Sequence, residues 1–381
     1  MNKVVKTIGL IGLLLILVLG MRFIAGSAEP DSREHNYARE KVEATEKEGK
    51  PARSKSLGVQ VKSKSFRAID RFARDATESD GRNLKAMAQY LASGCETDLE
   101  KARAIYVWLT KNISYDDVGY NVGNYDAYEA DEVFQVRKTV CGGFSNLFQA
   151  MGEEMGLEIQ TVSGYAKGFA FANGETLNEP NHAWNIIKID GKWRIFDATW
   201  GEGNGVNVNG QLISKKQFDD YWFDVDPYEA IFTHFPENPS LAFVEPVISL
   251  TEYGQLPYIR NSYFKLGFDG ETTYRKVLSN PDLVFPETFG IHSNVKVISA
   301  PTSGKLEVGK SYPFILESAS ARNVAGITNE ADWESFKQEG KRFELRYFVK
   351  EVGKLAITVQ ERGTGNSYSY ILQYQLVDQS L

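Results

Sequence analysis

Hydrophobic and polar residues alternate with two different periods along the chain, and each period predicts a different element. In the stretch that begins at Thr97, apolar residues recur at helical spacing, which predicts a helix capped by Thr97 or Asp98. A second helical pattern starts at Cys141 and ends at Gly156. Its apolar positions are Phe144, Leu147, Phe148, Met151 and Met155. Both elements are predicted to be amphipathic helices with one face in a core.

After the second helix the period changes to two, which predicts strands. Residues 157–167 form the first such run. The runs HAWNIIKI and KWRIFDATW then flank Asp190-Gly191, a dipeptide typical of the two-residue type I′ turn of a β-hairpin. Two polar stretches break the pattern and are predicted as loop or turn, namely residues 115–128 and the sequence GEGNG at 201–205. No Lys-Ser/Thr pair follows GEGNG, so it does not predict a phosphate-binding loop.

Beyond residue 245 the helical pattern fades and short alternating runs follow one another. They are VKVISA, RFELRYFVKEV, KLAITVQER and SYSYILQYQLV. Gly, Ser and Asn separate these runs, which predicts a mostly β, sandwich-like domain at residues 246–381. With the helices and hairpin before it, the chain is predicted to be of the α+β class.

The N-terminus differs in composition from the remainder of the chain. Residues 1–28 combine two lysines, an apolar run from residue 8 to 21 and small residues up to Ala28, which predicts a signal peptide cleaved near Ala28. Because the apolar character extends to residue 24, retention as a membrane anchor through residues 8–24 stays open. Residues 29–58 are charged and nearly free of apolar side chains, which predicts a flexible tether. The protein is therefore expected outside the cytoplasmic membrane, secreted or anchored.

Composition narrows the function classes. The chain has 381 residues, 42% hydrophobic and 24% charged, which fits two globular domains. A net charge of −7 without a long basic cluster argues against a nucleic-acid partner. Two cysteines and four scattered histidines argue against a structural zinc site, and no cofactor is predicted.

The predicted hairpin brings two polar side chains together. Counting outward from the two-residue turn places Trp184 opposite Asp197. The same register places His182 opposite Thr199, so His182 and Asp197 lie diagonally on one face, about 7–8 Å apart along the backbone and within reach of a hydrogen bond. A carboxylate that holds an imidazole in this way is the arrangement that orients a general base.

Cys141 is predicted to be a nucleophile. As the first residue of a helix, its sulfur lies at the positive end of the macrodipole, which favours the thiolate. Gly142 and Gly143 are expected to leave room for a substrate backbone. Cys141, His182 and Asp197 then form a nucleophile, base and orienter. In an exported protein a Cys95–Cys141 disulfide is the alternative, although Cys95 itself is expected to be an unreactive thiol.

The other candidate residues have weaker patterns. His234 is expected to be a core or second-site histidine, because only His182 has a predicted carboxylate neighbour. His35 lies in the tether and His292 in the β domain, where both are expected to be solvated. One oxyanion donor is the backbone N–H of Cys141, with Gln135 as a second candidate. The tryptophans near the hairpin are expected to pack and to line a cleft; they are Trp184, Trp193 and Trp200.

The motifs KTVCGGFSNLFQAM and NHAWNIIKIDGKWRIFDATWG, with the spacing between them, resemble the transglutaminase-like superfamily over residues 95–245. The resemblance implies a papain-like core at residues 59–245, in which a Cys-bearing helix packs on an antiparallel sheet and Cys141, His182 and Asp197 form the triad. The stretch WFDVDPYEAIFTHFPENP resembles the branch that contains kyphoscoliosis peptidase and cytokinesis proteins. That branch often has an acidic residue after the cysteine, where this chain has Gly142.

The residues and the resemblance together predict an exported cysteine acyl-transfer enzyme that acts on amide bonds in peptides or proteins, with cell-wall peptides as one candidate substrate. Hydrolysis by a peptidase or amidase is favoured. Transfer to an amine, as by a protein-glutamine γ-glutamyltransferase, is the first alternative. A non-catalytic envelope scaffold is the second.

Overall fold

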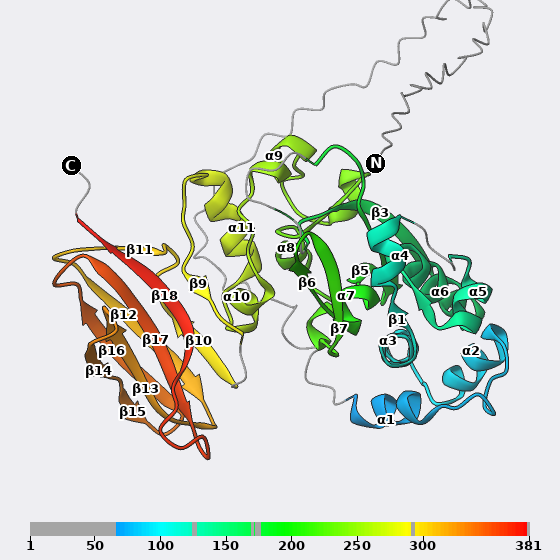
Figure 1. The fold of residues 1–381 in the computed structure, drawn as a ribbon, viewed down its shortest axis with the longest axis horizontal. Helices are drawn as coiled ribbons and strands as arrows, with labels where there is room; N and C mark the ends of the chain where they lie inside the picture. The colour runs from blue at the N-terminus through cyan, green and yellow to red at the C-terminus, as the bar shows by residue number, and fades with distance from the viewer. Residues whose placement is uncertain (1–65, 124–127, 169–170, 172–176, 291–293, 379–381) are drawn as a thin grey trace, which may run out of the picture. The chain divides into compact units, whose positions relative to one another are not determined.

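The computed structural model describes residues 66–123, 128–168, 171, 177–290 and 294–378 (Figure 1). The predicted signal peptide or anchor at 1–28 and the tether at 29–58 lie outside these residues, as do His35 and His292. Within the described part of the chain, no helix is both long and apolar enough to cross a membrane. The expectations about export and anchoring therefore stay predictions.

The first part of the described chain is helical. Its helices are α1 (Arg67–Asp75), α2 (Leu84–Ser93), α3 (Asp98–Asn112), α4 (Asp117–Val122), α5 (Ala130–Val136) and α6 (Cys141–Glu154). The predicted start of α3 is confirmed, because Thr97 and Glu100 form a reciprocal capping box there. The prediction of an unbroken loop at 115–128 is wrong. The side chain of Asp116 accepts a hydrogen bond from the Gly119 N–H, which starts α4 inside that stretch.

A four-stranded antiparallel sheet lies against α6 (Figure 1). Its strands are β3 (Ile159–Ala166), β4 (His182–Ile189), β5 (Lys192–Phe196) and β8 (His234–Pro236), in the order β5-β4-β3-β8. The predicted hairpin is confirmed, because Ile189 pairs with Lys192 across Asp190 and Gly191, whose φ angles are 51° and 76°. The α+β core with a Cys-bearing helix on an antiparallel sheet is therefore present.

The segment after β5 contains two elements that the sequence pattern did not predict. Helix α7 (Ala198–Glu202) is followed by a second hairpin of β6 (Gly203–Val208) and β7 (Gln211–Lys216). GEGNG is thus not a turn but the end of a helix and the start of a strand. The dipeptide Asn209-Gly210 supplies the hairpin turn, with φ angles of 53° and 84°, and it is the signal that could have revealed these strands. Short β1 (Ser114–Tyr115) and β2 (Lys138–Thr139) pair in parallel nearby.

Short helices continue well past residue 245, so the prediction that helical structure ends there is wrong. Beyond that residue lie α9 (Leu250–Gln255), α10 (Asn261–Lys265) and α11 (Gly270–Ser279). The short helices before it are η3 (Asp220–Trp222), α8 (Pro227–Ala230) and η4 (Pro239–Ala242). A capping box of Ser249 and Glu252 starts α9, and Asp269 caps α11. Because these helices are short, their apolar residues repeat over too few turns to give a helical pattern in the sequence. Capping residues define their ends instead.

The C-terminal region is mostly β, as predicted. One sheet has the order β10-β12-β16-β15 and the other β11-β18-β17-β13-β14, with β9 beside β18. The strands are β9 (Glu287–Thr288), β10 (Val295–Ser299), β11 (Lys305–Glu307), β12 (Ser311–Ser318), β13 (Ala321–Thr328), β14 (Asp332–Ser335), β15 (Lys337–Glu339), β16 (Arg342–Phe348), β17 (Gly353–Glu361) and β18 (Ser369–Val377). Buried and exposed residues alternate along β16, as expected for a strand with one face in a core.

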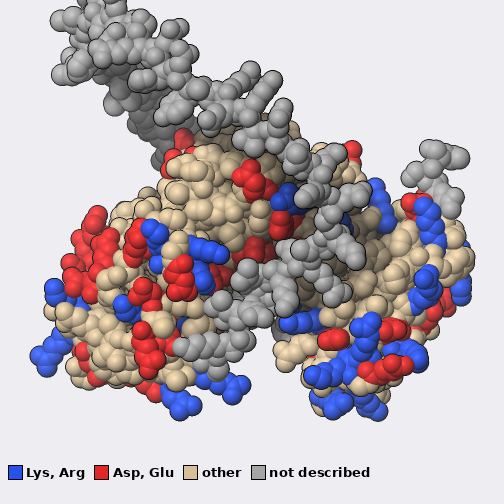
Figure 2. All heavy atoms as spheres, turned by 180° about the vertical axis from the view of Figure 1, so that it is seen from behind, with Lys and Arg blue, Asp and Glu red and all other residues tan. Residues whose placement is uncertain are grey.

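On the face drawn in Figure 2, basic and acidic side chains are interspersed. That face therefore offers no broad basic surface of the kind that neutralises nucleic-acid phosphates. The absence of a nucleic-acid partner stays a prediction.

Candidate active site

Cys141 begins α6, as the sequence predicts. Val140 occupies the cap position without a side-chain hydrogen bond, so the thiol lies on the first turn, where backbone N–H groups lack helical partners. The cysteine is half-buried, whereas Phe144 and Phe148 on the same side of the helix are fully buried in the core. The helix start therefore presents the sulfur at the border between core and solvent.

Gly142 and Gly143 have a structural reason that differs from the predicted one. A Cβ atom at Gly142 would lie 2.3 Å from the ring of Tyr128, and one at Gly143 would lie 2.0 Å from the Thr139 hydroxyl. Both glycines are buried. They allow α6 to pack against its own neighbours, and the prediction that they make room for a substrate backbone is wrong.

The structure brings His182 and Asp197 together. Nε2–H of His182 donates to Oδ2 of Asp197 over 2.8 Å, and both side chains are buried. The predicted position of Thr199 opposite His182 is wrong, because β5 ends at Phe196. Asp197 instead caps α7, where its Oδ1 accepts the Trp200 N–H over 2.9 Å. The carboxylate is thus fixed through both of its oxygens.

His234 also binds Asp197, which the sequence reasoning missed. Nε2–H of His234 donates to the same Oδ2 over 3.1 Å, and its Nδ1 lies 2.9 Å from the Thr233 hydroxyl. His234 is on β8, which pairs with β3 through Ala166 and not with the predicted hairpin. No local signal could have revealed this contact, because it depends on how a distant strand joins the sheet.

Three tryptophan rings surround His234. The ring centroids of Trp200, Trp184 and Trp222 lie 4.4, 5.1 and 5.1 Å from that of His234. Burial lowers the pKa of His234 below its ordinary value, although the Asp197 carboxylate opposes the shift. His234 is therefore neutral at pH 7 and acts on Asp197 as a hydrogen-bond donor.

The electrostatics of the site favour an ion pair between thiolate and imidazolium. Burial alone would lower the pKa of His182, but the Asp197 carboxylate outweighs it and raises that pKa to about 10. Burial would raise the pKa of the Cys141 thiol, yet its contact with the His182 imidazole lowers it below the ordinary value. Although burial opposes it, the two histidines hold the pKa of Asp197 well below its usual range. Since Nε2 of His182 binds Asp197, Nδ1 is the ring nitrogen left to contact the sulfur.

Cys141 and His182 line a cleft of 740 Å³. Other parts of its wall come from Trp200 and Trp222, from the β6–β7 hairpin and from α10. Gln135, the candidate oxyanion donor, is exposed on α5 and is not among the residues that line this cleft. The cleft thus places the sulfur in a space large enough for several residues of a peptide.

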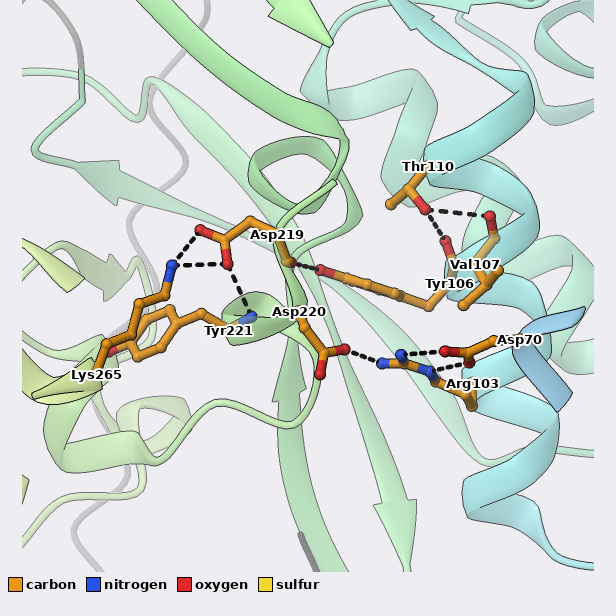
Figure 3. A network of polar contacts seen from close by, with 9 residues as sticks. All are labelled: Asp70, Arg103, Tyr106, Val107, Thr110, Asp219, Asp220, Tyr221 and Lys265. Atoms are coloured by element: carbon orange, nitrogen blue, oxygen red, sulfur yellow. Dashed lines mark hydrogen bonds and ion pairs between the residues drawn. The ribbon is translucent and has the colours of Figure 1, made fainter. Parts of the chain in front are cut away.

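A polar network holds Asp219 and Asp220 (Figure 3). Asp220 begins η3, which ends at Trp222. Arg103 on α3 binds both carboxylate oxygens of Asp70, at 2.7 and 2.9 Å, and also binds Asp220. On the other side, Lys265 on α10 binds both oxygens of Asp219, at 2.7 and 2.8 Å. Charged groups from α1, α3 and α10 therefore fix two successive residues of one segment.

This segment in turn positions the Asp197 carboxylate. The backbone N–H of Asp197 donates to the Trp222 carbonyl over 3.0 Å, and Asp219 donates its own N–H to the Gly201 carbonyl over 2.9 Å. The network is therefore a rigid support behind α7 and Asp197.

Both cysteines are free thiols, so the alternative Cys95–Cys141 disulfide is absent. Cys95 lies just after α2 and donates its thiol to the Leu91 carbonyl over 3.2 Å. Burial, with the nearby Glu100 carboxylate, raises the pKa of Cys95 to about 11.

One cluster could in principle hold a metal ion. Ligand atoms of His182, Asp197 and His234 lie within 4.8 Å of one another. Both imidazoles, however, direct their Nε2–H groups at a single carboxylate oxygen. This is the geometry of a hydrogen-bonded cluster, whereas metal ligands direct lone pairs at a common point.

Several known proteins are similar to parts of this chain. The family model of the Transglutaminase-like superfamily matches residues 85–198. Kyphoscoliosis peptidase of Homo sapiens is 26% identical over 328 residues, which cover 85% of this chain and 44% of that protein. Cytokinesis protein 3 of Schizosaccharomyces pombe is 25% identical over 275 residues, which cover 69% of this chain and 30% of that protein. The crystal structure of a TGase aligns with 44% of this chain and 38% of that chain, at 19% identity and a TM-score of 0.23.

The chain spans less than half the length of these two curated relatives. The matched residues 85–198 contain the Cys-bearing helix, the predicted hairpin and the residues Cys141, His182 and Asp197. This chain therefore carries a domain of the transglutaminase-like superfamily.

Proposed function

We propose that this protein is a cysteine acyl-transfer enzyme that hydrolyses amide bonds in peptides or proteins. The observation that carries the proposal is the pairing of Cys141 with His182 at the wall of a 740 Å³ cleft, with Asp197 hydrogen-bonded behind the imidazole. A lowered thiol pKa beside a raised imidazole pKa supplies nucleophile and proton donor at neutral pH.

The acylation step uses both members of the ion pair. The Cys141 thiolate attacks the amide carbon, a C–S bond forms, and the carbonyl electron pair moves onto oxygen. The backbone N–H of Cys141, at the start of α6, is one donor to that oxyanion. When the intermediate collapses, the C–N bond breaks, and the Nδ1 proton of His182 goes to the leaving amine.

The resulting thioester is resolved by water. Neutral His182 accepts a proton from the water as its oxygen attacks the thioester carbon, and the carboxylic acid and the Cys141 thiolate are released. A primary amine attacking in place of water would give transfer. Hydrolysis is preferred because the relative matched over 85% of this chain is named a peptidase.

Asp197 and His234 act through His182. Asp197 holds the Nε2–H tautomer and stabilises the imidazolium, as a triad carboxylate does. His234 and the Trp200 N–H keep that carboxylate ionised and correctly oriented. Both are positioning residues, because neither lies on the path of the transferred proton.

The proposed location of the activity rests on the N-terminal sequence alone. We propose that residues 1–28 export the chain, so that its substrates are peptides or proteins outside the cytoplasmic membrane, including cell-wall peptides. Separation of cells into cytoplasmic and envelope fractions, with the protein located by antibody, tests this proposal. Recovery in the cytoplasm would refute it.

One incubation separates the candidate activities. The protein is mixed with glutamine-containing peptides and a labelled primary amine, and the products are analysed by mass spectrometry. Shorter peptides or a newly formed carboxylate indicate hydrolysis, and incorporated label indicates transfer. If neither product forms and iodoacetamide does not label Cys141, the protein is a scaffold and the proposal is wrong. The Cys141→Ala variant is the control for both products.

A further inference from the structure

The β6–β7 hairpin has two outer edges that differ. Val208 and Gln211 pair next to the two-residue turn, and Gly205 pairs with Ser214. In such a hairpin the pair beside the turn exchanges hydrogen bonds, and every second pair does not. The N–H and C=O groups of Gly203, Gly205 and Asn207 therefore point away from β7.

The outer edge of β7 is already occupied. Leu212 donates its N–H to the Asn121 side chain over 2.9 Å, and its carbonyl accepts from the same amide over 2.8 Å. The Ser214 N–H donates to Asp117 over 3.2 Å. Side chains of α4 thus satisfy the outward groups of β7, at the alternate positions that the register predicts.

In the part of the chain that the structure describes, no hydrogen bond from another segment covers the outer edge of β6. Among the described residues, the sheet contains β6 and β7 only, and all but the first residue of β6 are exposed. Gly203, Gly205 and Val206 line the same cleft as Cys141. Only the five residues of α7 separate Asp197 from Gly203, and a helix of that length spans about 7.5 Å. An open strand edge therefore begins on the wall of the cleft that also contains the Cys141 sulfur.

We propose that the outer edge of β6 binds the backbone of the substrate, which adds to the hairpin as a third, extended strand and so leads its scissile amide to Cys141. This inference rests on the proposed function and names its substrate class, a peptide segment in extended conformation. Main-chain hydrogen bonds to Gly203, Gly205 and Asn207 provide the affinity, as in other complexes formed by strand addition.

The exposed face of the hairpin sets a side-chain preference. Val206, Val208 and Ile213 are 53%, 48% and 44% exposed and share one face, because side chains alternate along each strand. Every second side chain of an added strand lies beside these residues. Peptides with apolar residues at alternate positions are therefore preferred.

A second copy of the chain is the competing occupant of this edge. Pairing of β6 with β6 of another molecule would require both hairpins to enter each other's cleft beside Trp200 and Trp222. A single extended peptide needs only the width of one strand. The continuity of the edge with the cleft therefore favours the peptide.

The test uses peptides that react with Cys141 without turnover. A set of apolar hexapeptides is prepared, each with one iodoacetyl group at its N-terminal or its C-terminal end. Each peptide also carries a single N-methyl group, and the methylated amide differs from one peptide to the next. Alkylation of Cys141 is followed by mass spectrometry. N-methylation at every second position is expected to slow alkylation about fivefold, the effect of one lost main-chain hydrogen bond, and the positions between are expected to be unaffected. A uniform effect along the peptide would overturn the proposal.

Two variants test the same edge from the protein side. Gly205→Pro removes an outward N–H, whereas Gly205→Ala keeps it and is the matched control. Only the proline variant is expected to slow alkylation by the unmethylated peptide, again about fivefold, while iodoacetamide reacts equally with both. Equal losses in the two variants would contradict the proposal. A second contradicting result would be a wild-type dimer, seen by sedimentation, that Gly205→Pro dissociates while peptide alkylation stays unchanged. Failure of iodoacetamide to label wild-type Cys141 would instead refute the proposed function.

Discussion

The two cysteines of this protein occupy opposite electrostatic environments. Cys141 begins a helix, and the His182 imidazole lowers the pKa of its thiol against the effect of burial. Cys95 follows the end of a helix, and burial with the nearby Glu100 carboxylate raises its pKa to about 11. The thiol group is the same, so the difference comes from the neighbouring charge.

This difference shows what makes one thiol more acidic than the other. The position of Cys141 at a helix start accounts for only part of the lowering of its pKa, since a helix macrodipole contributes about 0.3–1 kcal/mol at a surface site. The larger contribution at Cys141 comes from His182, which is held ready by Asp197. The predictions below test whether reactivity follows these neighbours.

The largest effect is expected at Cys141, the proposed nucleophile. Cys141→Ser replaces a thiolate with a hydroxyl that stays protonated beside the same imidazole, so amide hydrolysis should fall by at least about 10⁴-fold. The rate is measured with the best peptide found in the product assay. Thermal unfolding is followed in parallel, because an unchanged Tm separates lost chemistry from lost structure. Activity within tenfold of wild type would show that the chemistry lies elsewhere.

Selective alkylation compares the two thiols within one molecule. At pH 7 a pKa of about 11 leaves a thiolate fraction at Cys95 on the order of 10⁻⁴. The pKa of Cys141 is lowered from the ordinary value of 9.0, so its thiolate fraction at pH 7 is larger, and iodoacetamide should label it at least about tenfold faster than Cys95. Peptide mapping by mass spectrometry gives both rates. Equal labelling at neutral pH would remove the proposed distinction.

His234 tests the support behind the ion pair. His234→Phe removes one hydrogen bond to the Asp197 carboxylate, which raises the pKa of that group toward its usual value. Asp197 is ionised, and so stabilises the His182 imidazolium, only at pH values above the pKa of Asp197. This stabilisation is lost as the pH falls through the pKa of Asp197. The acid limit of Cys141 alkylation should therefore move to higher pH, and kcat should fall about tenfold.

His234→Gln is the conservative control, because its side-chain amide can still donate. It should recover most of kcat and the wild-type acid limit. If both variants keep the wild-type pH profile, His234 has only a packing role among the tryptophans that surround it.

Elements with a strong local signal were predictable from sequence. The apolar period from Phe144 to Met155 gave α6, and Asp190-Gly191 gave the hairpin and its register. The contact between His182 and Asp197 followed from that register. The predicted pairing of Thr199 with His182 is wrong, because Asp197 starts a helix and the strand ends before it.

Contacts between distant segments were not predictable. His234 reaches Asp197 because β8 pairs with β3, and no pattern near residue 234 encodes that pairing. The strand β6 has the sequence GNGVNV, which resembles a loop because glycine and asparagine have low strand propensity. Pairing with β7 overrides that propensity, and the Asn209-Gly210 turn between the two strands was the local signal for this hairpin.

The smallest effect is expected at Cys95. Cys95→Ser keeps a donor for the Leu91 carbonyl, so hydrolysis should stay within about twofold of wild type and stability within about 1 kcal/mol. The pKa of Cys95 is raised in the folded state, so the neutral thiol stabilises the fold, and this contribution is lost as the pH rises from the ordinary value of 9.0 through about 11. Urea unfolding of the wild type should therefore show a decline in this range that is absent from the variant. An identical decline in both proteins would mean that the thiol ionises as easily in the folded as in the unfolded chain, and the contrast with Cys141 would then rest on His182 alone.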